Sequence, residues 1–358
     1  MPSFSHILGQ ERAKKFLKNV LAGEKIPHAY LFTGIPGVGK TSTAMALAMA
    51  LNCNEPVEEE GCAGCVACRQ LRSGNSPDFL IIARLPDRKN ILIEQIQEFN
   101  RKLGFAPLGR YRVSVIQEAE TMTAEAANCL LKTLEEPPAG NIIILNAVEP
   151  LELMPTIVSR CQRVPFQPLP LRDMRNWLVQ KGHMEEETAR VMARISGGSL
   201  GRVLKMRESD FVEKRRKWLQ MLLKLPGLSK EKGFQMAMEC ADEAKKIGLL
   251  SKDDGKTGAL DMLALWESWY RDLLIVKVGG PAHLLINEDY FHMIKSIIEN
   301  FTIDNLIDSL MAVDQAERDL RRRRNISLVM EHVALHLGRL AGSHGARRPG
   351  SGVTESAV

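Results

Sequence analysis

Residues 34–41 read Gly-Ile-Pro-Gly-Val-Gly-Lys-Thr and match G-x-x-x-x-G-K-[ST], the pattern of a phosphate-binding loop. The apolar run 29–33 precedes the loop and predicts a buried strand, and residues 42–51 follow it with the composition of a helix. Strand, glycine-rich loop and helix in this order are the context in which the motif binds phosphate. The sequence therefore predicts a nucleotide site, the alternative being a glycine-rich turn that binds nothing.

Each residue type in this loop has a chemical task. Glycines allow backbone conformations in which successive N–H groups point at phosphate oxygens, and the following helix adds partial positive charge at its N-terminus. The lysine would reach the β- and γ-phosphates of ATP, and the threonine hydroxyl would ligate Mg²⁺. The expected nucleotide-binding residues are Gly34, Gly37, Gly39, Lys40, Thr41 and Ser42.

Four of the seven cysteines follow the loop helix within a short insertion, with the spacing C-x8-C-x2-C-x2-C. Thiolates at such short spacing suit tetrahedral Zn²⁺, and because the set offers no open coordination position, the metal would be structural. Free thiols or disulfides are the alternatives, and the clustering favours a metal. The expected zinc ligands are Cys53, Cys62, Cys65 and Cys68.

Hydrolysis of ATP needs an acidic residue at the end of a second core strand to organise Mg²⁺, and a neighbouring carboxylate to polarise water. The predicted strand 113–116 is followed by Gln117 and Glu118 rather than by two acids. Gln117 is a poorer ligand for a hard cation, whereas Glu118 stands where the water-polarising carboxylate would lie. Glu120 could substitute, although it lies two positions further on. The pattern weakens the prediction of hydrolysis more than that of binding.

The composition is that of a globular protein: 45% of residues are hydrophobic, 25% charged and 5% aromatic, and the net charge is +5. This weak positive charge is compatible with a nucleic-acid neighbour, and the scarcity of aromatic residues argues against a stacking platform for single strands. No apolar run reaches the ~18 residues that span a bilayer, and residues 1–6 lack the features of a signal peptide. We therefore expect a cytoplasmic protein without membrane contact.

Strands and helices alternate up to residue 166, which predicts a doubly wound α/β domain with a parallel sheet. Beyond residue 169 the periodicity is almost entirely helical, and 358 residues are too many for one ordinary core. The strands are expected near 29–33, 78–83, 111–116, 141–147 and 162–166. The expected parts are an α/β domain at 1–168 with the cysteine insertion at 53–68, helical domains at 169–208 and 209–340, and a disordered tail at 341–358.

Two strings further along the chain are highly specific: L-L-K-T-L-E-E-P-P within 128–138, and S-R-C at 159–161. Together with Ile7–Gln10, the phosphate loop and the cysteine insertion, they resemble the AAA+ clamp-loader ATPases of bacterial DNA polymerase III. This family includes the gamma/tau and delta-prime subunits, and replication factor C subunits are more remotely similar. The resemblance covers residues 1 to about 205, and beyond them only the helical character matches.

The resemblance implies that Arg160 is presented in trans to ATP bound by a neighbouring subunit, as a permanent cation at developing phosphoryl charge. An ordinary surface arginine is the alternative. The resemblance also implies that residues 169–208 form a lid and 209–340 a collar that holds a ring of subunits together. The implied partners are gamma/tau and delta subunits in a hetero-oligomer and, through the complex, the sliding clamp and primed DNA.

Three departures from the gamma-type pattern favour a delta-prime-type subunit. Gln117 replaces the usual Mg²⁺-organising aspartate. The family usually has a threonine or asparagine at a sensor position on the fourth strand. That position falls at residues 147–148 here, and Asn146 lies one or two places before it. Gly201 stands where gamma-type subunits have an arginine, and Arg202 is shifted by about 100° around a helix, away from the nucleotide.

The leading interpretation is a clamp-loader subunit that acts as a stator, with weak or absent ATPase activity of its own, inside a complex that is a DNA-directed DNA polymerase. The alternative is a gamma-type subunit that itself binds and hydrolyses ATP with the help of Glu118. A third hypothesis is a zinc-dependent DNA-binding module. Its support is limited to the basic run 321–324, which is otherwise a solvated helix face or a contact with an acidic neighbour.

Overall fold

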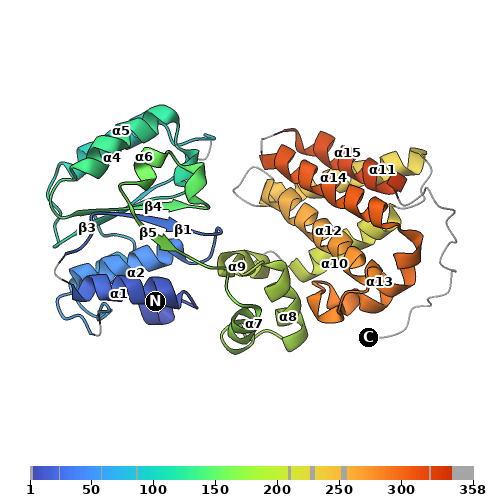
Figure 1. Ribbon diagram of the computed structural model, residues 1–358, viewed down its shortest axis with the longest axis horizontal. Helices are drawn as coiled ribbons and strands as arrows, with labels where there is room; N and C mark the ends of the chain where they lie inside the picture. Colours follow the sequence, from blue (N-terminus) through green and yellow to red (C-terminus); the bar gives the residue numbers. More distant parts are fainter. Residues whose placement is uncertain are drawn as a thin grey trace. The chain divides into compact units, whose positions relative to one another are not determined.

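The chain forms two compact units, Met1–Met206 and Arg207–Val358 (Figure 1). The computed structural model describes residues 3–23, 25–57, 59–85, 88–208, 211–225, 230–250, 256–321 and 324–340. The predicted disordered tail, 341–358, and two arginines of the basic run, Arg322 and Arg323, lie outside these described residues.

The first unit is built on a five-stranded parallel sheet with the order β2-β3-β4-β1-β5 (Figure 1). The central strand β1 pairs with β4 on one side and β5 on the other, so long connections must cross the faces of the sheet. This topology confirms the predicted doubly wound α/β fold. The strands are β1 (Ala29–Thr33), β2 (Phe79–Ile82), β3 (Arg112–Ile116), β4 (Asn141–Ala147) and β5 (Gln162–Pro165).

Each face of the sheet is covered by its own layer of helices, because successive strand side chains point to opposite faces. Tyr30 and Phe32 of β1 pack with α1 (Glu11–Ala22) and α2 (Lys40–Asn52) on one face. Leu31 packs on the other face, in a separate cluster. The helices of that second face are α4 (Ile93–Leu103), α5 (Ala124–Glu135) and α6 (Pro155–Val158).

The carboxyl ends of the parallel strands share one edge of the sheet, which is where open α/β sheets bind ligands. The phosphate loop follows β1 at this edge, and Gln117 and Glu118 follow β3. The register pairs Thr33 with Ala147, so the end of β4 lies directly beside the start of the loop. The fold therefore brings three segments that are distant in sequence to one place.

Three further helices complete the first unit after the sheet. They are α7 (Leu171–Gln180), α8 (Glu186–Ile195) and α9 (Leu200–Glu208). The backbone N–H of Leu169 donates to the carbonyl of Gly198 at 2.9 Å, which ties the start of this segment to the turn before α9. The first residues of α9 are thereby held at the phosphate-loop end of the unit.

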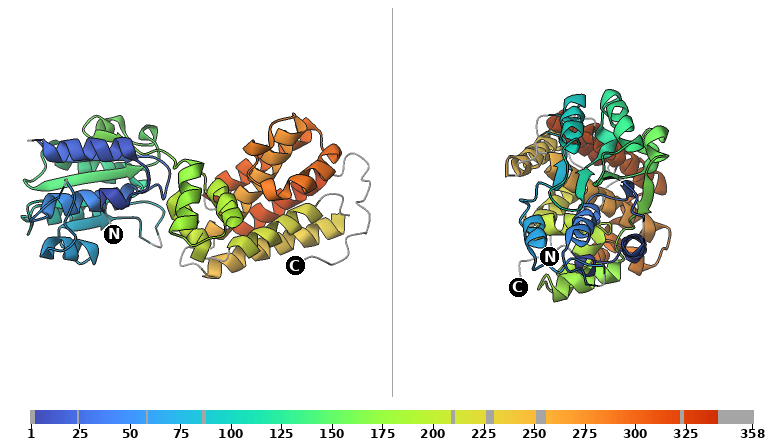
Figure 2. Two further views of the ribbon diagram at one scale, coloured as in Figure 1. Left: turned by 90° about the horizontal axis from the view of Figure 1, so that it is seen from below. Right: turned by 90° about the vertical axis from the view of Figure 1, so that its left-hand side faces the viewer.

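The second unit consists of helices in its described residues, and no strand occurs among them. The helices α11, α15, α14 and α12 each pack against the next, and α12 packs against α11 again, so that the four form a bundle (Figures 1 and 2). Within the described residues, no helix is long and apolar enough to cross a membrane. The helices are α10 (Phe211–Lys224), α11 (Lys230–Leu250), α12 (Lys256–Lys277), α13 (Phe291–Ile297), α14 (Ile303–Arg321) and α15 (Ile326–Leu340).

A buried charged network fixes the 286–290 turn inside the second unit. The guanidinium of Arg215 donates to both carboxylate oxygens of Asp289, at 2.7 and 2.9 Å, and to Asn287 at 2.8 Å. Asn287 donates in turn to Asp272 at 2.9 Å and to Ser268 at 3.1 Å. Such a network is satisfied only while every partner is present, because each buried polar group otherwise loses its partner without regaining water.

Arg215→Ala should therefore lower the free energy of unfolding of the second unit by about 3–5 kcal/mol, since it leaves buried acceptors unpaired. Arg216→Ala is the matched control, because Arg216 is 60% exposed and meets Glu213 at 3.4 Å. The control should change stability by less than about 0.5 kcal/mol. Urea unfolding followed by circular dichroism measures both, and equal effects of the two variants would contradict the importance of the network.

Candidate functional site

The phosphate loop begins in a space that only glycine fits. The N–H of Gly34 donates to the carbonyl of Val148 at 2.9 Å, and its backbone has a φ of +139°. A Cβ at this position would lie 2.5 Å from the carbonyl oxygen of Phe166. The ends of β4 and β5 thus enclose the first residue of the loop, and any side chain there would push the strands apart.

A pocket of about 500 Å³ lies beside the loop, within the size range of small-ligand sites. It brings together five of the six residues expected to bind nucleotide, all except Gly34. Most of the remaining lining is apolar and comes from three other segments, which suits the flat ring of a base. The remaining lining residues are His6, Ile7, Leu8, Val38, Leu169, Leu200, Gly201 and Leu204.

The amino group of Lys40 is folded back onto the loop. It donates to the carbonyl oxygens of Gly34 and Ile35, the latter at 3.1 Å. Burial lowers the pKa of this lysine, while the charges of Glu120 and Glu118 act in the opposite direction. The amine thus caps loop carbonyls in this conformation, and it must turn outward to meet a phosphate.

The hydroxyl oxygen of Thr41 accepts hydrogen bonds from two side-chain amides. Nδ2 of Asn146 donates to it at 3.1 Å and Nε2 of Gln117 at 3.4 Å. Asn146 is 4% exposed, and its Oδ1 has no hydrogen-bond partner among the described residues. Sequence reasoning set Asn146 aside as one or two places early, yet it is the β4 side chain that reaches the loop. The available signal was the alternation of side chains along β4, which places Asn146 on the face toward the loop.

The two acidic residues after β3 have different surroundings. Glu118, the predicted water-polarising residue, accepts a hydrogen bond from Nε of Arg84 at 2.6 Å and forms an ion pair with it. Sequence reasoning missed Arg84, which follows β2 and had no recognisable motif. Glu120 is partly buried, and burial raises its pKa, assisted by Glu152 and Glu118. Neither carboxylate forms a hydrogen bond with Thr41, which Gln117 contacts in place of an acid.

Arg160 lies at the surface and is held by neighbours from its own unit. Its guanidinium donates to Glu135 of α5 at 2.8 Å from Nε, and to the carbonyl of Thr156 at 2.8 Å. The side chain remains 34% exposed, so part of the guanidinium faces solvent. Glu135 belongs to the specific string within 128–138, and the fold therefore brings the two most specific strings of the sequence into contact.

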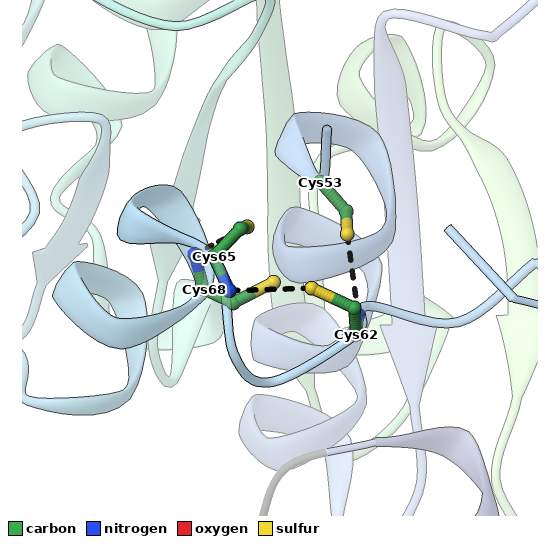
Figure 3. A group of neighbouring side chains, drawn as sticks. All are labelled: Cys53, Cys62, Cys65 and Cys68. Atoms are coloured by element: carbon green, nitrogen blue, oxygen red, sulfur yellow. Dashed lines mark hydrogen bonds between the residues drawn. The ribbon is translucent and has the colours of Figure 1, made fainter. Parts of the chain in front are cut away.

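The four predicted metal ligands converge between the end of α2 and α3 (Val66–Arg72), as Figure 3 shows. Their sulfur atoms all lie within 4.8 Å of one another, and none of the described cysteines forms a disulfide. Four thiolates around one zinc ion would be about 3.8 Å apart, given Zn–S bonds of about 2.3 Å. The donor set therefore fits a tetrahedral metal ion.

Backbone N–H groups of the cluster point at its sulfur atoms. Cys62 donates to the sulfur of Cys53 at 3.2 Å, and Cys65 to that of Cys62 at 3.3 Å (Figure 3). Burial alone would raise the pKa of Cys65, but hydrogen bonds from Asn54 and Cys68 lower it to about 6. Burial instead raises the pKa of Cys53 and of Cys68, and a bound metal ion would lower the pKa of all four thiols.

Comparison with known proteins agrees with this geometry. The family described as DNA polymerase III, delta subunit, matches residues 9–170. The delta' subunit of DNA polymerase III from Bacillus subtilis is 32% identical over 329 residues, which is 92% of this chain and 96% of the relative. The chain belongs to the DNA polymerase III delta' family. Membership extends through the second unit, because the match spans nearly the whole of both proteins.

Other relatives of this delta' family member match over shorter lengths. The tau subunit from Bacillus subtilis is 40% identical, but over 46% of this chain and 29% of the relative. The delta' subunit from Escherichia coli is 32% identical over 54% of this chain and 59% of the relative. A gamma subunit-related protein from Thermotoga maritima has a TM-score of 0.44 at 21% identity, covering 91% and 99% of the two chains. That last similarity is too low to support an inference.

In this delta' family member, the start of α9 rests directly on the phosphate loop. The N–H of Gly201 donates to the carbonyl of Gly37 at 2.9 Å, and the hydroxyl of Ser199 donates to that of Pro36 at 2.8 Å. A Cβ on Gly201 would lie 2.8 Å from Cα of Gly37. The arginine that gamma-type subunits are expected to have here has no room in this conformation. Arg202 is not among the described residues that line the pocket.

Gly201→Ala should therefore separate α9 from the loop and lower the free energy of unfolding of the first unit by roughly 1–3 kcal/mol. Gly23→Ala is the control, because a Cβ there meets ordinary contacts no closer than 3.4 Å. Chemical denaturation of both variants measures the difference. A Gly201→Ala protein as stable as the control would show that the close approach to Gly37 is not needed.

Proposed function

We propose that this chain is a stator subunit of a DNA polymerase III clamp loader, which helps to place the sliding clamp on primed DNA. The observation that carries the proposal is the delta' relative that matches 92% of this chain. The gamma-type alternative is not favoured, because the tau relative matches only 46% of the chain. The expected partners are gamma/tau and delta subunits, and the expected location is the cytoplasm.

The parts of the chain have distinct tasks in this proposal. Residues 1–168 hold nucleotide through the six expected loop residues, and 169–208 form the lid whose last helix contacts the loop. Residues 209–340 form the collar that joins neighbouring subunits. The ATPase activity of the chain itself is weak or absent in this proposal. The residue at the position that should organise Mg²⁺, Gln117, carries an amide, and Glu118 is paired with Arg84.

Assembly tests the proposed role directly. The full chain mixed with gamma/tau and delta subunits should elute as one complex in size-exclusion chromatography, and that complex should load the clamp onto primed DNA. A mixture that lacks this chain should not load it. An isolated chain that hydrolyses ATP at the rate of the complex would instead identify it as a working ATPase subunit.

Arg160 is the proposed catalytic residue, acting in trans on ATP bound by a neighbouring subunit. Glu135 orients its planar guanidinium, and the exposed remainder can approach a phosphate. Ion pairs of exposed groups are weak, so an anionic phosphate of a neighbour competes well for the arginine. The ion pair with Glu135 therefore orients Arg160 but does not prevent it from moving to a phosphate.

Arg160→Ala should leave assembly intact and lower ATP turnover of the reconstituted complex by roughly tenfold or more, because the transition-state charge loses a cation. Arg172→Ala is the matched control, since Arg172 is an exposed arginine on α7. The measurement is steady-state phosphate release in the presence of clamp and primed DNA. Unchanged turnover in the Arg160→Ala complex would refute the assignment.

The cysteine cluster is proposed to bind one structural zinc ion through Cys53, Cys62, Cys65 and Cys68. The convergence of four sulfurs supports a metal, and the all-thiolate donor set favours zinc. The ion would connect the end of α2 to α3 and so stabilise an insertion that has few apolar side chains of its own.

The purified chain should contain about one Zn²⁺ per molecule by elemental analysis. Cys62→Ser should lose the metal and lower the melting temperature by several degrees, because the insertion loses its cross-link. Cys129→Ser is the control, as Cys129 lies on α5 away from the cluster. A protein without metal that has four free, titratable thiols in the cluster would disprove the zinc site.

A further inference from the structure

The contacts of Thr41 are inconsistent with the usual role of this hydroxyl. A threonine oxygen has two lone pairs, and a loop that binds Mg²⁺ gives one of them to the ion. Here both are directed at amide N–H groups, from Asn146 at 3.1 Å and from Gln117 at 3.4 Å. A divalent cation could ligate this oxygen only after at least one of the two amides had turned away.

No carboxylate among the described residues forms a hydrogen bond with the hydroxyl of Thr41. Gln117 occupies the position at the end of β3 where an acid would hold the ion, and Glu118 is paired with Arg84. Glu120 is half-buried, and its Oε2 has no hydrogen-bond partner among the described residues. In the described part of the chain, the cysteine cluster is the one group of three or more metal-binding side chains close enough to hold an ion.

The phosphate-binding elements of the loop do not depend on a metal. The pocket keeps the loop residues 37–42, and α2 directs its N-terminus at the same place. Backbone N–H groups, the helix dipole and Lys40 all favour negative charge. Mg²⁺ therefore does not fit the residues present, whereas a phosphate chain does.

We propose that this phosphate loop binds a nucleotide without Mg²⁺, with the amides of Gln117 and Asn146 occupying the hydroxyl that would otherwise ligate the ion. The proposal rests on the nucleotide site of the proposed function and not on the clamp-loader role. The bound nucleotide is then a structural ligand, because no metal ion stabilises the charge that would develop on its phosphates during hydrolysis. A nucleoside diphosphate suits the site best, since it has fewer phosphate charges and holds Mg²⁺ less tightly than a triphosphate.

Calorimetric titration of the full chain with ADP and with ATP tests this proposal. One series uses excess Mg²⁺ and the other a Mg²⁺-free buffer prepared without a chelator, so that the cysteine cluster keeps any metal. We expect the affinity for ADP to change by less than twofold between the series and that for ATP not to rise with Mg²⁺. A tenfold or greater rise with Mg²⁺ for either nucleotide would overturn the proposal, as would the absence of binding in both buffers.

Gln117→Asp should convert the site into one that binds nucleotide together with Mg²⁺. The new carboxylate removes one amide donor from Thr41 and supplies a hard ligand, so Mg²⁺ should now raise the affinity for ATP at least tenfold. Gln97→Asp makes the same chemical change on the exposed face of α4 and should behave as the wild type. A folded Gln117→Asp protein without Mg²⁺ dependence would contradict the role of the amides. The wild-type titrations decide the question if this variant does not fold.

The two proposals can fail separately. If the wild-type chain binds no nucleotide but still assembles with gamma/tau and delta and supports clamp loading, the metal-free site is wrong and the stator role stands. If nucleotide binds without Mg²⁺ but no complex forms, the stator role is wrong and the site stands.

Discussion

The close packing of Gly34 between the ends of β4 and β5 is the constraint on which the rest of the site depends. Its N–H is held by Val148, and the carbonyl of Phe166 leaves no space for a Cβ. This contact sets where β1 stops and where α2 begins. The loop between them must then turn within a few residues, which its glycines permit. Every other functional group at this edge is positioned relative to that turn.

The polar groups around the loop have partners within the protein, and Lys40 must leave its partners before it can meet a phosphate. Lys40 donates to loop carbonyls, Thr41 accepts two amides, and Glu118 is paired with Arg84. Gly201 brings α9 into backbone contact with Gly37. Together these contacts hold the loop closed against α9 and the end of β4. This arrangement is consistent with the proposed stator role.

Arg160, the residue proposed to act on a neighbouring subunit, lies elsewhere on the same unit. Arg160 and Glu135 come from two separate specific strings, and only the packing of α6 beside α5 makes them a pair. The cysteine insertion lies on the opposite layer, at the far end of α2. The molecule thus separates the pocket beside its phosphate loop, Arg160 and the cysteine cluster, although one sheet supports all three.

The sequence by itself determined the five strands, the phosphate loop and the cysteine cluster, because each depends on local spacing and on residues close in the chain. Only the tertiary structure decided which distant side chains meet: Asn146 with Thr41, Arg84 with Glu118, and Glu135 with Arg160. Those contacts follow from strand order and register, which bring together residues up to 105 positions apart. No local pattern encodes that proximity, and so the closed state of the loop could not be predicted from the motif.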